Sequence, residues 1–440
     1  MKKFILLCLV VLAASCSEKD PKEYAAAASN PMFIHNAYEK LTDVIIHDIF
    51  SPPVSSRIYA YASIAGYEAL ITENENYKSL AGQLHGLENF PKPEKGEQYC
   101  YQLASIKAIM TVARALTFTV NKYDDFEKET YKAFEDAGVP SSVMDRSMEF
   151  GEAIGKHVLA YSKGDNYLQT RGLRYTVKTE GDKWVPTPPQ YADAMEPYWA
   201  TIRTMVIDSA SQFPPAPVIP YSKDKNSPYW KELLQVYDTV NNLTEEQKST
   251  AWFWDDNAFV MNVQGHVMFA NKKMTPGGHW MAISRTACKN AKKDIYESAE
   301  AYLKVALALH EAFICSWHEK FKSEKIRPET VINAEIDPKW ATFLQTPPFP
   351  EYTSGHSTIS AASAEALTSL FGDNFAFTDS TEFKYDHGIR KFESFRKAAL
   401  DCSVSRLYGG IHYWSGCDEG NKAGVRIGQY VSEKVKTKIK

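Results

Sequence analysis

Apolar residues recur along most of the chain at steps of three and four positions, which is the spacing of one face of an α-helix. The first half shows no sustained alternation of apolar and polar residues, so no β-strand is predicted there. Pro53 follows Ser51-Pro52 and suits the first turn of a helix. The pattern therefore predicts an all-α protein, with helices over residues 32–50, 98–118, 122–137, 141–163, 227–242 and 294–321 and a further helix that opens at Pro53.

Residues 164–226 interrupt this helical pattern. They contain the runs Val185-Pro186-Thr187-Pro188-Pro189 and Pro214-Pro215-Ala216-Pro217, and proline inside a helix removes a hydrogen bond and clashes with the preceding turn. We expect an ordered crossover between two antiparallel helical bundles. Two more helix starts are marked in the second half, by the capping-box pair Thr244 and Gln247 and by a turn at Thr275-Pro276-Gly277-Gly278.

The first residues have the pattern of an export signal. Lys2 and Lys3 precede an apolar run over residues 4–12 that is too short for a stable membrane span. Ala13-Ala14-Ser15-Cys16 resembles a lipoprotein processing box, which would make Cys16 the lipidated first residue of an exported protein, anchored to a bacterial membrane on its periplasmic or cell-surface side. The alternative is ordinary cleavage to a soluble periplasmic protein. The expected segments are a signal peptide over 1–16, a tether over 17–30, an N-terminal helical half over 31–226 and a C-terminal bundle over 227–440.

Composition and charge give information on partners, membrane spans and disulfides. The formal net charge of −4 gives no electrostatic reason to expect a nucleic-acid partner. No later stretch has about 18 consecutive apolar residues, so no further membrane span is expected. Cys402 and Cys417 either form a disulfide, which an oxidising compartment permits, or are two independently buried thiols. The pattern does not indicate an oligomeric state.

The first motif with chemical meaning is Lys320 followed, after six residues, by Arg327-Pro328. Lys320 continues an apolar stripe on the predicted long helix, where an unpaired buried ammonium is costly. Either it reaches solvent at the helix end or it has a buried partner. Pro328 disfavours helical geometry at Arg327, which directs that guanidinium back towards Lys320. The stripe consists of Tyr302, Ala306, Leu309, Phe313 and Trp317.

The second motif is Ser354-Gly355-His356, which opens a helix rich in alanine and serine that extends to Gly372. Gly355 allows the backbone to approach a ligand closely, and the free amides at a helix start bind anions. His356 is placed to donate a proton to whatever binds there. Alone the motif is weak, because serine and glycine are common helix caps.

The third motif is Ser405-Arg406, followed after five residues by His412. Arg406 offers a planar fork for two oxygens of one oxyanion, and the imidazole of His412 can bond to phosphorus or vanadium. Each of these residues taken singly fits a structural role equally well. Together the three motifs supply three cations, a serine, a glycine amide and two histidines. Phosphate and vanadate are highly charged oxyanions, and binding them requires such cations and hydrogen-bond donors.

The order Lys-x6-Arg-Pro, Ser-Gly-His, Ser-Arg-x5-His resembles the superfamily of vanadium-dependent haloperoxidases and type 2 phosphatidic acid phosphatases, with the motifs inside residues 290–435. The helical first half and the Phe253-Trp254 and Pro276–Trp280 regions look like bacterial members of the haloperoxidase branch. The resemblance implies a fold like that of vanadium chloroperoxidase and acid phosphatase.

The resemblance also implies roles for the site residues. Arg406 would bind vanadate oxygens together with Lys320, Arg327, Ser354 and Gly355. His412 would be the axial ligand of vanadium and His356 the acid–base group, and Lys320 would also be catalytic, polarising the peroxide oxygen towards halide attack. In a phosphatase, which would need no cofactor because phosphate is part of the substrate, His412 would form a phosphohistidine. Two positions depart from the family pattern: Thr353 replaces a proline, and Gly416 replaces an aspartate that orients the nucleophilic histidine.

Our leading hypothesis is a vanadate-dependent peroxidase that oxidises halide with hydrogen peroxide. The alternative is a periplasmic acid phosphatase acting on phosphomonoesters, and a third hypothesis is a surface-anchored binding lipoprotein with a degenerate site. His310 and His318 are assigned to packing or surface positions, because no His-Glu-x-x-His spacing is present. His279 is a weaker candidate for the pocket mouth.

Overall fold

The computed structural model of the chain describes residues 21–72, 74–258, 260–264, 267–270 and 272–439. The predicted signal peptide and Cys16 lie outside these residues. The described part is mostly helical, which confirms the all-α prediction. The helices of the first half are α1 (Pro21–Ala28), α2 (Met32–His47), α3 (Pro52–Ile71), α4 (Tyr101–Leu116), η1 (Val120–Tyr123), α5 (Asp124–Asp136), α6 (Ser141–Ser162), α7 (Tyr167–Thr170) and η2 (Trp199–Thr201).

The second half adds further helices and two short antiparallel hairpins, one formed by β1 and β2 and one by β3 and β4. The strands are β1 (Met261–Gln264), β2 (Val267–Ala270), β3 (Phe377–Asp379) and β4 (Arg390–Phe392). The helices are α8 (Pro228–Asn241), α9 (Glu245–Phe253), α10 (Pro276–Asn290), α11 (Ile295–Ser323), α12 (Pro328–Glu335), α13 (Gly355–Phe371), η3 (Thr381–Tyr385), α14 (Phe395–Tyr408) and α15 (Trp414–Lys434).

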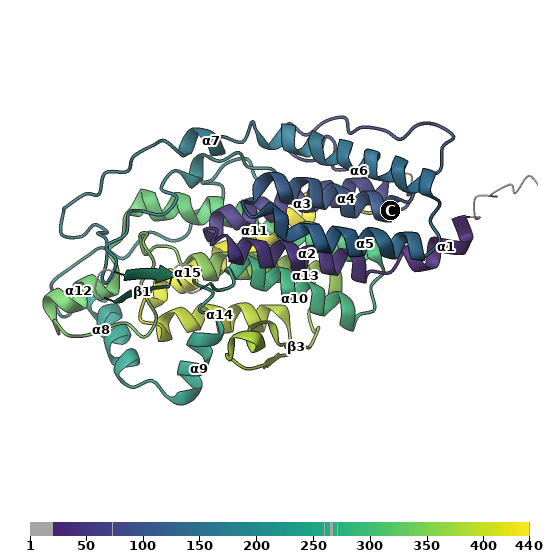
Figure 1. Cartoon of the computed structure of the whole chain (residues 1–440). Helices are drawn as coiled ribbons and strands as arrows, with labels where there is room; N and C mark the ends of the chain where they lie inside the picture. Colours follow the sequence, from purple (N-terminus) through teal and green to yellow (C-terminus); the bar gives the residue numbers. More distant parts are fainter. Residues whose placement is uncertain (1–20, 73, 259, 265–266, 271, 440) are drawn as a thin grey trace, which may run out of the picture.

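Helix α11 runs through the middle of the molecule (Figure 1) and packs against α3 on one side and α13 on the other. It opens with a capping box between Asp294 and Glu297, and every residue from Ser298 to Trp317 is buried. A helix that is buried on all faces must be surrounded by other elements. Because it joins the N-terminal helices to the C-terminal ones, α11 fixes the position of Lys320 in its last turn.

Helix α15 lies against α13 at very short range. A Cβ atom at Gly424 would overlap the carbonyl oxygen of Thr358, and a Cβ at Gly428 would overlap that of Ala362. The two glycines are four residues apart and therefore lie on one face of α15. This close packing holds α13, whose first turn carries Ser354-Gly355-His356.

The predicted helix boundaries agree with the structure to within a few residues, and residues 164–226 form an irregular crossover with only the short helices α7 and η2. Two details were wrong. The tether predicted over 17–30 contains α1, whose Tyr24 is buried in the core. The turn predicted at 275–278 belongs to α10, because the Thr275 side chain caps the helix and Pro276 occupies its first turn. The boundary at residues 226/227 stays a prediction.

All five cysteines after residue 20 are free and buried, so Cys402 and Cys417 are separate thiols. Among the described residues, no helix combines the length and the apolar character needed to cross a bilayer.

We predict that Gly424→Ala lowers the free energy of unfolding by about 2 kcal/mol, because about 3 kcal/mol of overpacking is offset by about 1 kcal/mol of helix propensity. Equilibrium denaturation in urea measures the change. Gly172→Ala is the control, since a Cβ at Gly172 meets no atom within 4 Å. Equal stability of the two variants would contradict the close packing of α13 on α15.

Candidate oxyanion site

Lys320 lies at the buried end of the apolar stripe on α11 and is fully shielded from solvent. Its Nζ donates to the carbonyl oxygens of Pro350 and Glu351, each at 3.0 Å, and to that of Thr353. Burial and the Arg327 charge hold the pKa of Lys320 well below its usual value. The lysine therefore ties the end of α11 to the loop before α13, and its positive charge lies inside the protein.

Arg327 has the extended backbone predicted for a residue before proline, with φ −76° and ψ 150°. Its Nε donates to the carbonyl of Phe349 at 2.9 Å and its Nη1 to that of Ile411 at 2.6 Å. Nη1 also lies 3.2 Å from Nε2 of His412, whereas Nη2 is buried and finds no partner in the described part of the chain. Burial lowers the pKa of Arg327 to about 10, so it remains cationic at neutral pH.

Ser354 is the N-cap of α13, as predicted. Its Oγ accepts hydrogen bonds from the Ser357 amide at 3.3 Å and from the Ser357 hydroxyl at 3.0 Å, so its own proton can be donated to a ligand. A Cβ at Gly355 would lie 3.3 Å from the Trp317 ring, which favours glycine at this close approach. Gly355 and His356, at the start of α13, line the same cavity as His412, and the free amides of a helix start bind anions.

Arg406 lies in the last turn of α14 and contacts a segment that the motifs did not indicate. Its Nη2 donates to the Trp254 carbonyl, and its Nη1 lies 3.4 Å from both the Asp255 carbonyl and Nε2 of His356. His356 also bonds to the Asp255 backbone. Burial and the Arg406 charge hold the pKa of His356 well below its usual value, so this imidazole is neutral and able to accept a proton.

The carboxylate that orients His412 belongs to Glu351, a residue outside the three sequence motifs. Nδ1 of His412 lies 2.8 Å from Glu351 Oε1. A proton on Nδ1 donates to this carboxylate and leaves the Nε2 lone pair for a ligand. Burial and the Arg327 charge hold the pKa of His412 well below its usual value, so the ring is neutral.

Gly416 explains why this carboxylate comes from another segment. A Cβ atom at 416 would overlap Glu351 Oε1. The glycine that replaces the expected aspartate therefore makes room for Glu351, which performs the same positional task. In the sequence, the only sign that another carboxylate takes this position was the absence of an aspartate at position 416.

Carboxylates offset the charges of the site only at longer range: Glu351 acts on Lys320 and Arg327, and Glu329 acts on Arg327. Lys320, Arg327 and Arg406 are all buried, and among the described residues none of them forms an ion pair with a carboxylate. Buried charges are normally paired, because transfer from water costs several kcal/mol per ion. The orphaned Nη2 of Arg327 and the free amides at the start of α13 fit the oxygens of a tetrahedral oxyanion, so the donor set fits vanadate.

A small cavity of about 30 Å³ lies beside the start of α13 and the ring of His412. Gly355, His356 and His412 line its polar side, and the opposite wall is apolar. The wall excludes bulk water from the ligand and strengthens electrostatic interactions in the cavity. The apolar lining residues are Pro52, Pro276, Phe313, Trp317, Pro347, Phe349 and Ile411.

The structure thus brings the predicted residues of all three motifs to one place. The hypothesis for His279 was wrong: it is fully buried between carboxylates and does not line the mouth of this cavity. His310 is a packed core residue, as expected, and burial lowers its pKa to about 4.

A search of the curated proteins gave no match. A family model described as the VCPO second helical-bundle domain matches residues 300–440. The crystal structures of a bacterial vanadium-dependent chloroperoxidase in apo and holo types match with TM-scores of 0.64 and 0.66 at 17% and 16% identity. These matches cover 87% and 95% of this chain and 94% and 96% of those chains, and they show a common fold.

The crystal structure described as the first bacterial vanadium-dependent iodoperoxidase is similar at the level of sequence as well. It matches with a TM-score of 0.87 and 41% identity, over 93% of this chain and 97% of that chain. Identity of this extent, over nearly the whole length and with all three motifs in place, means that the chain belongs to the vanadium-dependent haloperoxidase superfamily.

Proposed function

We propose that the protein is a vanadate-dependent haloperoxidase and that iodide is its preferred halide. The observation that carries the proposal is the set of three buried cations that form no ion pair with a described carboxylate, near a neutral His412 held by Glu351. The similarity to an iodoperoxidase supports the choice of halide. In the reaction, iodide and hydrogen peroxide, with one proton, give hypoiodous acid and water.

Each residue has a separate task in this proposal. Arg327 and Arg406 hold vanadate oxygens, with the Ser354 hydroxyl and the Gly355 amide as further donors. His412 Nε2 binds vanadium, and Glu351 keeps this nitrogen unprotonated. When bound, vanadate supplies a Lewis acid that activates hydrogen peroxide for attack by halide.

Lys320 acts mainly through its charge. Its Nζ is occupied by three carbonyl oxygens, so it fixes the loop before α13 and adds positive potential behind the oxyanion. His356 is neutral and partly exposed, and it takes up the proton of the incoming peroxide.

An acid phosphatase is the second candidate, and the contact between Glu351 and His412 favours it, because a phosphohistidine intermediate needs such a carboxylate. The 41% identity to an iodoperoxidase over 93% of this chain favours the peroxidase. We therefore rank the peroxidase first. Export and lipid anchoring at Cys16 are proposed on the N-terminal sequence pattern alone.

With vanadate, hydrogen peroxide and iodide, we expect the purified protein to form triiodide, measured by absorbance. His412→Ala should reduce the rate to background because it removes the vanadium ligand, and His157→Ala on α6 should not. Phosphate release from a chromogenic ester is measured in parallel. Ester turnover without halide oxidation would overturn the ranking, and neither activity would point to a binding protein.

Orthovanadate should stabilise the protein, since it supplies the missing counter-charge. Saturation at about 100 times the Kd corresponds to about 2.7 kcal/mol, visible as a higher Tm in a thermal melt. Arg406→Ala should lose most of the shift, and Arg146→Ala on α6 should retain it. An unchanged Tm in the wild-type protein would contradict an oxyanion site.

We predict that Glu351→Gln lowers kcat by roughly 10–100-fold, because the neutral amide no longer fixes the proton on Nδ1 of His412. Glu433→Gln, which is exposed on α15, is the control. Gly416→Asp alone should abolish activity, since its side chain overlaps Glu351. Glu351→Ala combined with Gly416→Asp should recover part of it. A double variant no better than Gly416→Asp would mean that position 416 cannot supply the carboxylate.

A further inference from the structure

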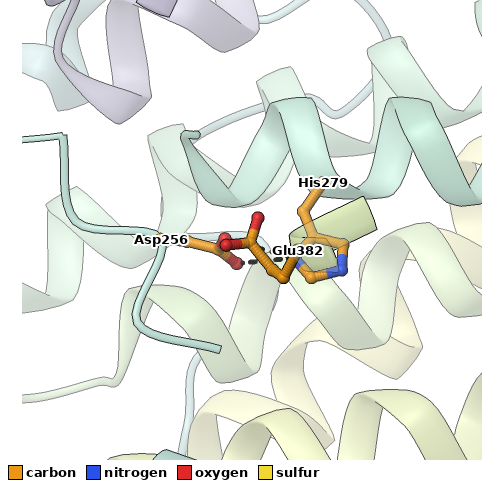
Figure 2. A group of neighbouring side chains, drawn as sticks. All are labelled: Asp256, His279 and Glu382. Atoms are coloured by element: carbon orange, nitrogen blue, oxygen red, sulfur yellow. Dashed lines mark hydrogen bonds and ion pairs between the residues drawn. The ribbon is translucent and has the colours of Figure 1, made fainter. Parts of the chain in front are cut away.

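A second charged cluster lies behind the oxyanion site and takes no part in the proposed reaction. Asp256 follows α9, His279 lies in the first turn of α10, and Glu382 lies in η3. All three are buried, and one ligand atom of each lies within 4.8 Å of the others. Figure 2 shows the three side chains pointing towards one another.

The imidazole of His279 is fixed from both sides. Its Nε2 lies 2.9 Å from Asp379 Oδ2, and its ring stacks on Trp254 at a centroid distance of 4.6 Å. Its Nδ1 lies 3.1 and 3.0 Å from the two carboxylate oxygens of Asp256. If Nε2 carries a proton, it donates to Asp379. The Nδ1 lone pair then faces the two carboxylate oxygens of Asp256, which are also acceptors. A proton or a metal cation must therefore lie between Nδ1 and Asp256.

A proton on Nδ1 would satisfy His279 and Asp256 but would leave Glu382 unsatisfied. Glu382 is only 3% exposed, and its Oε1 has no hydrogen-bond partner among the residues that the structure describes. Lys273, the nearby cation, is bound to Asp255 at 2.6 Å. Burial and the Asp256 charge raise the pKa of Glu382 to about 8, so this carboxyl is mostly protonated at neutral pH unless a cation lies beside it. An unpartnered buried polar oxygen is also costly, so the imidazolium alone leaves the cluster incomplete.

We propose that Asp256, His279 Nδ1 and Glu382 bind a divalent cation of the zinc class, with Asp379 orienting the imidazole. Zn²⁺ binds both histidine nitrogen and carboxylate oxygen, and Mn²⁺, which carboxylates suit well, is the nearest competitor. A histidine ligand whose second nitrogen donates to a carboxylate is the usual arrangement at such centres. Neighbouring ligands bonded at about 2.1 Å lie roughly 3.0–3.4 Å apart, which is close to the spacing of Asp256 and His279.

The position of this centre gives it a structural task. Asp256 directly follows Trp254 and Asp255, whose carbonyls receive the Arg406 guanidinium. A cation that ties Asp256 to α10 and η3 would hold these carbonyls in place. The inference stands independently of the halide reaction, because the cluster contains none of the three oxyanion motifs.

The test uses purified full-length protein that has been treated with chelator and desalted, without vanadate. ZnCl2 and MnCl2 are titrated separately by isothermal calorimetry, and the bound metal is then counted by mass spectrometry. We expect about one Zn²⁺ per chain, and a Tm that falls with chelator and recovers with Zn²⁺. Glu382→Gln and His279→Gln should weaken binding at least ten-fold, and Glu433→Gln and His157→Gln should not.

Absence of binding of both metals by the wild-type protein would overturn the proposal, even if the variants fail to fold. Binding that is unchanged in both Glu382→Gln and His279→Gln would also overturn it, since the ion would then lie elsewhere. Preference for Mn²⁺ over Zn²⁺ would retain the site and reject the zinc assignment. Because the titration measures no catalysis, these outcomes are distinct from failure of the proposed peroxidase activity.

Discussion

Three cationic side chains are buried together without a carboxylate partner, and the rest of the site is arranged around this constraint. Lys320 and Arg327 are shielded from water, and Arg406 is nearly so. The protein compensates them with backbone carbonyl oxygens, which come from the loop before α13, from Ile411 and from the segment after α9. Carbonyl dipoles reduce the cost of burial but do not neutralise the charge, and this residual positive charge is the basis of the proposed oxyanion site.

Helix termini reinforce this arrangement. Lys320 and Arg406 lie in the last turns of α11 and α14, where the helix dipole favours positive charge. Gly355 lies at the start of α13, where the free amides favour negative charge. The glycine contacts between α13 and α15, and the burial of α11 between the two halves, bring these three helix ends to one place. Packing far from the site therefore determines its electrostatics.

The two charged clusters are joined by one short segment of chain. Trp254 and Asp255 give carbonyls to Arg406, and Trp254 also stacks on His279. One cluster is rich in cations and the other in carboxylates. Because residues 254–255 contact both clusters, a change in the conformation of this segment would affect both of them.

The sequence by itself determined the helical class, most helix positions and the three oxyanion motifs. Each of these depends on local properties: the helical period of apolar residues, the geometry of Pro328 after Arg327, and the cap at Ser354. The sequence also placed Lys320 on the apolar stripe that includes Trp317, but it left open whether the ammonium reaches solvent or has a buried partner.

Only the tertiary structure decided which groups complete the site. Glu351 faces His412 across 61 positions of sequence, and no local pattern relates a carboxylate to a histidine so far away. Gly416 has meaning only beside Glu351, and the residues around His279 come from separate segments. Local sequence fixes backbone conformation over a few residues, whereas charge pairing depends on which helix ends meet, and the packing of α11, α13 and α15 decides this.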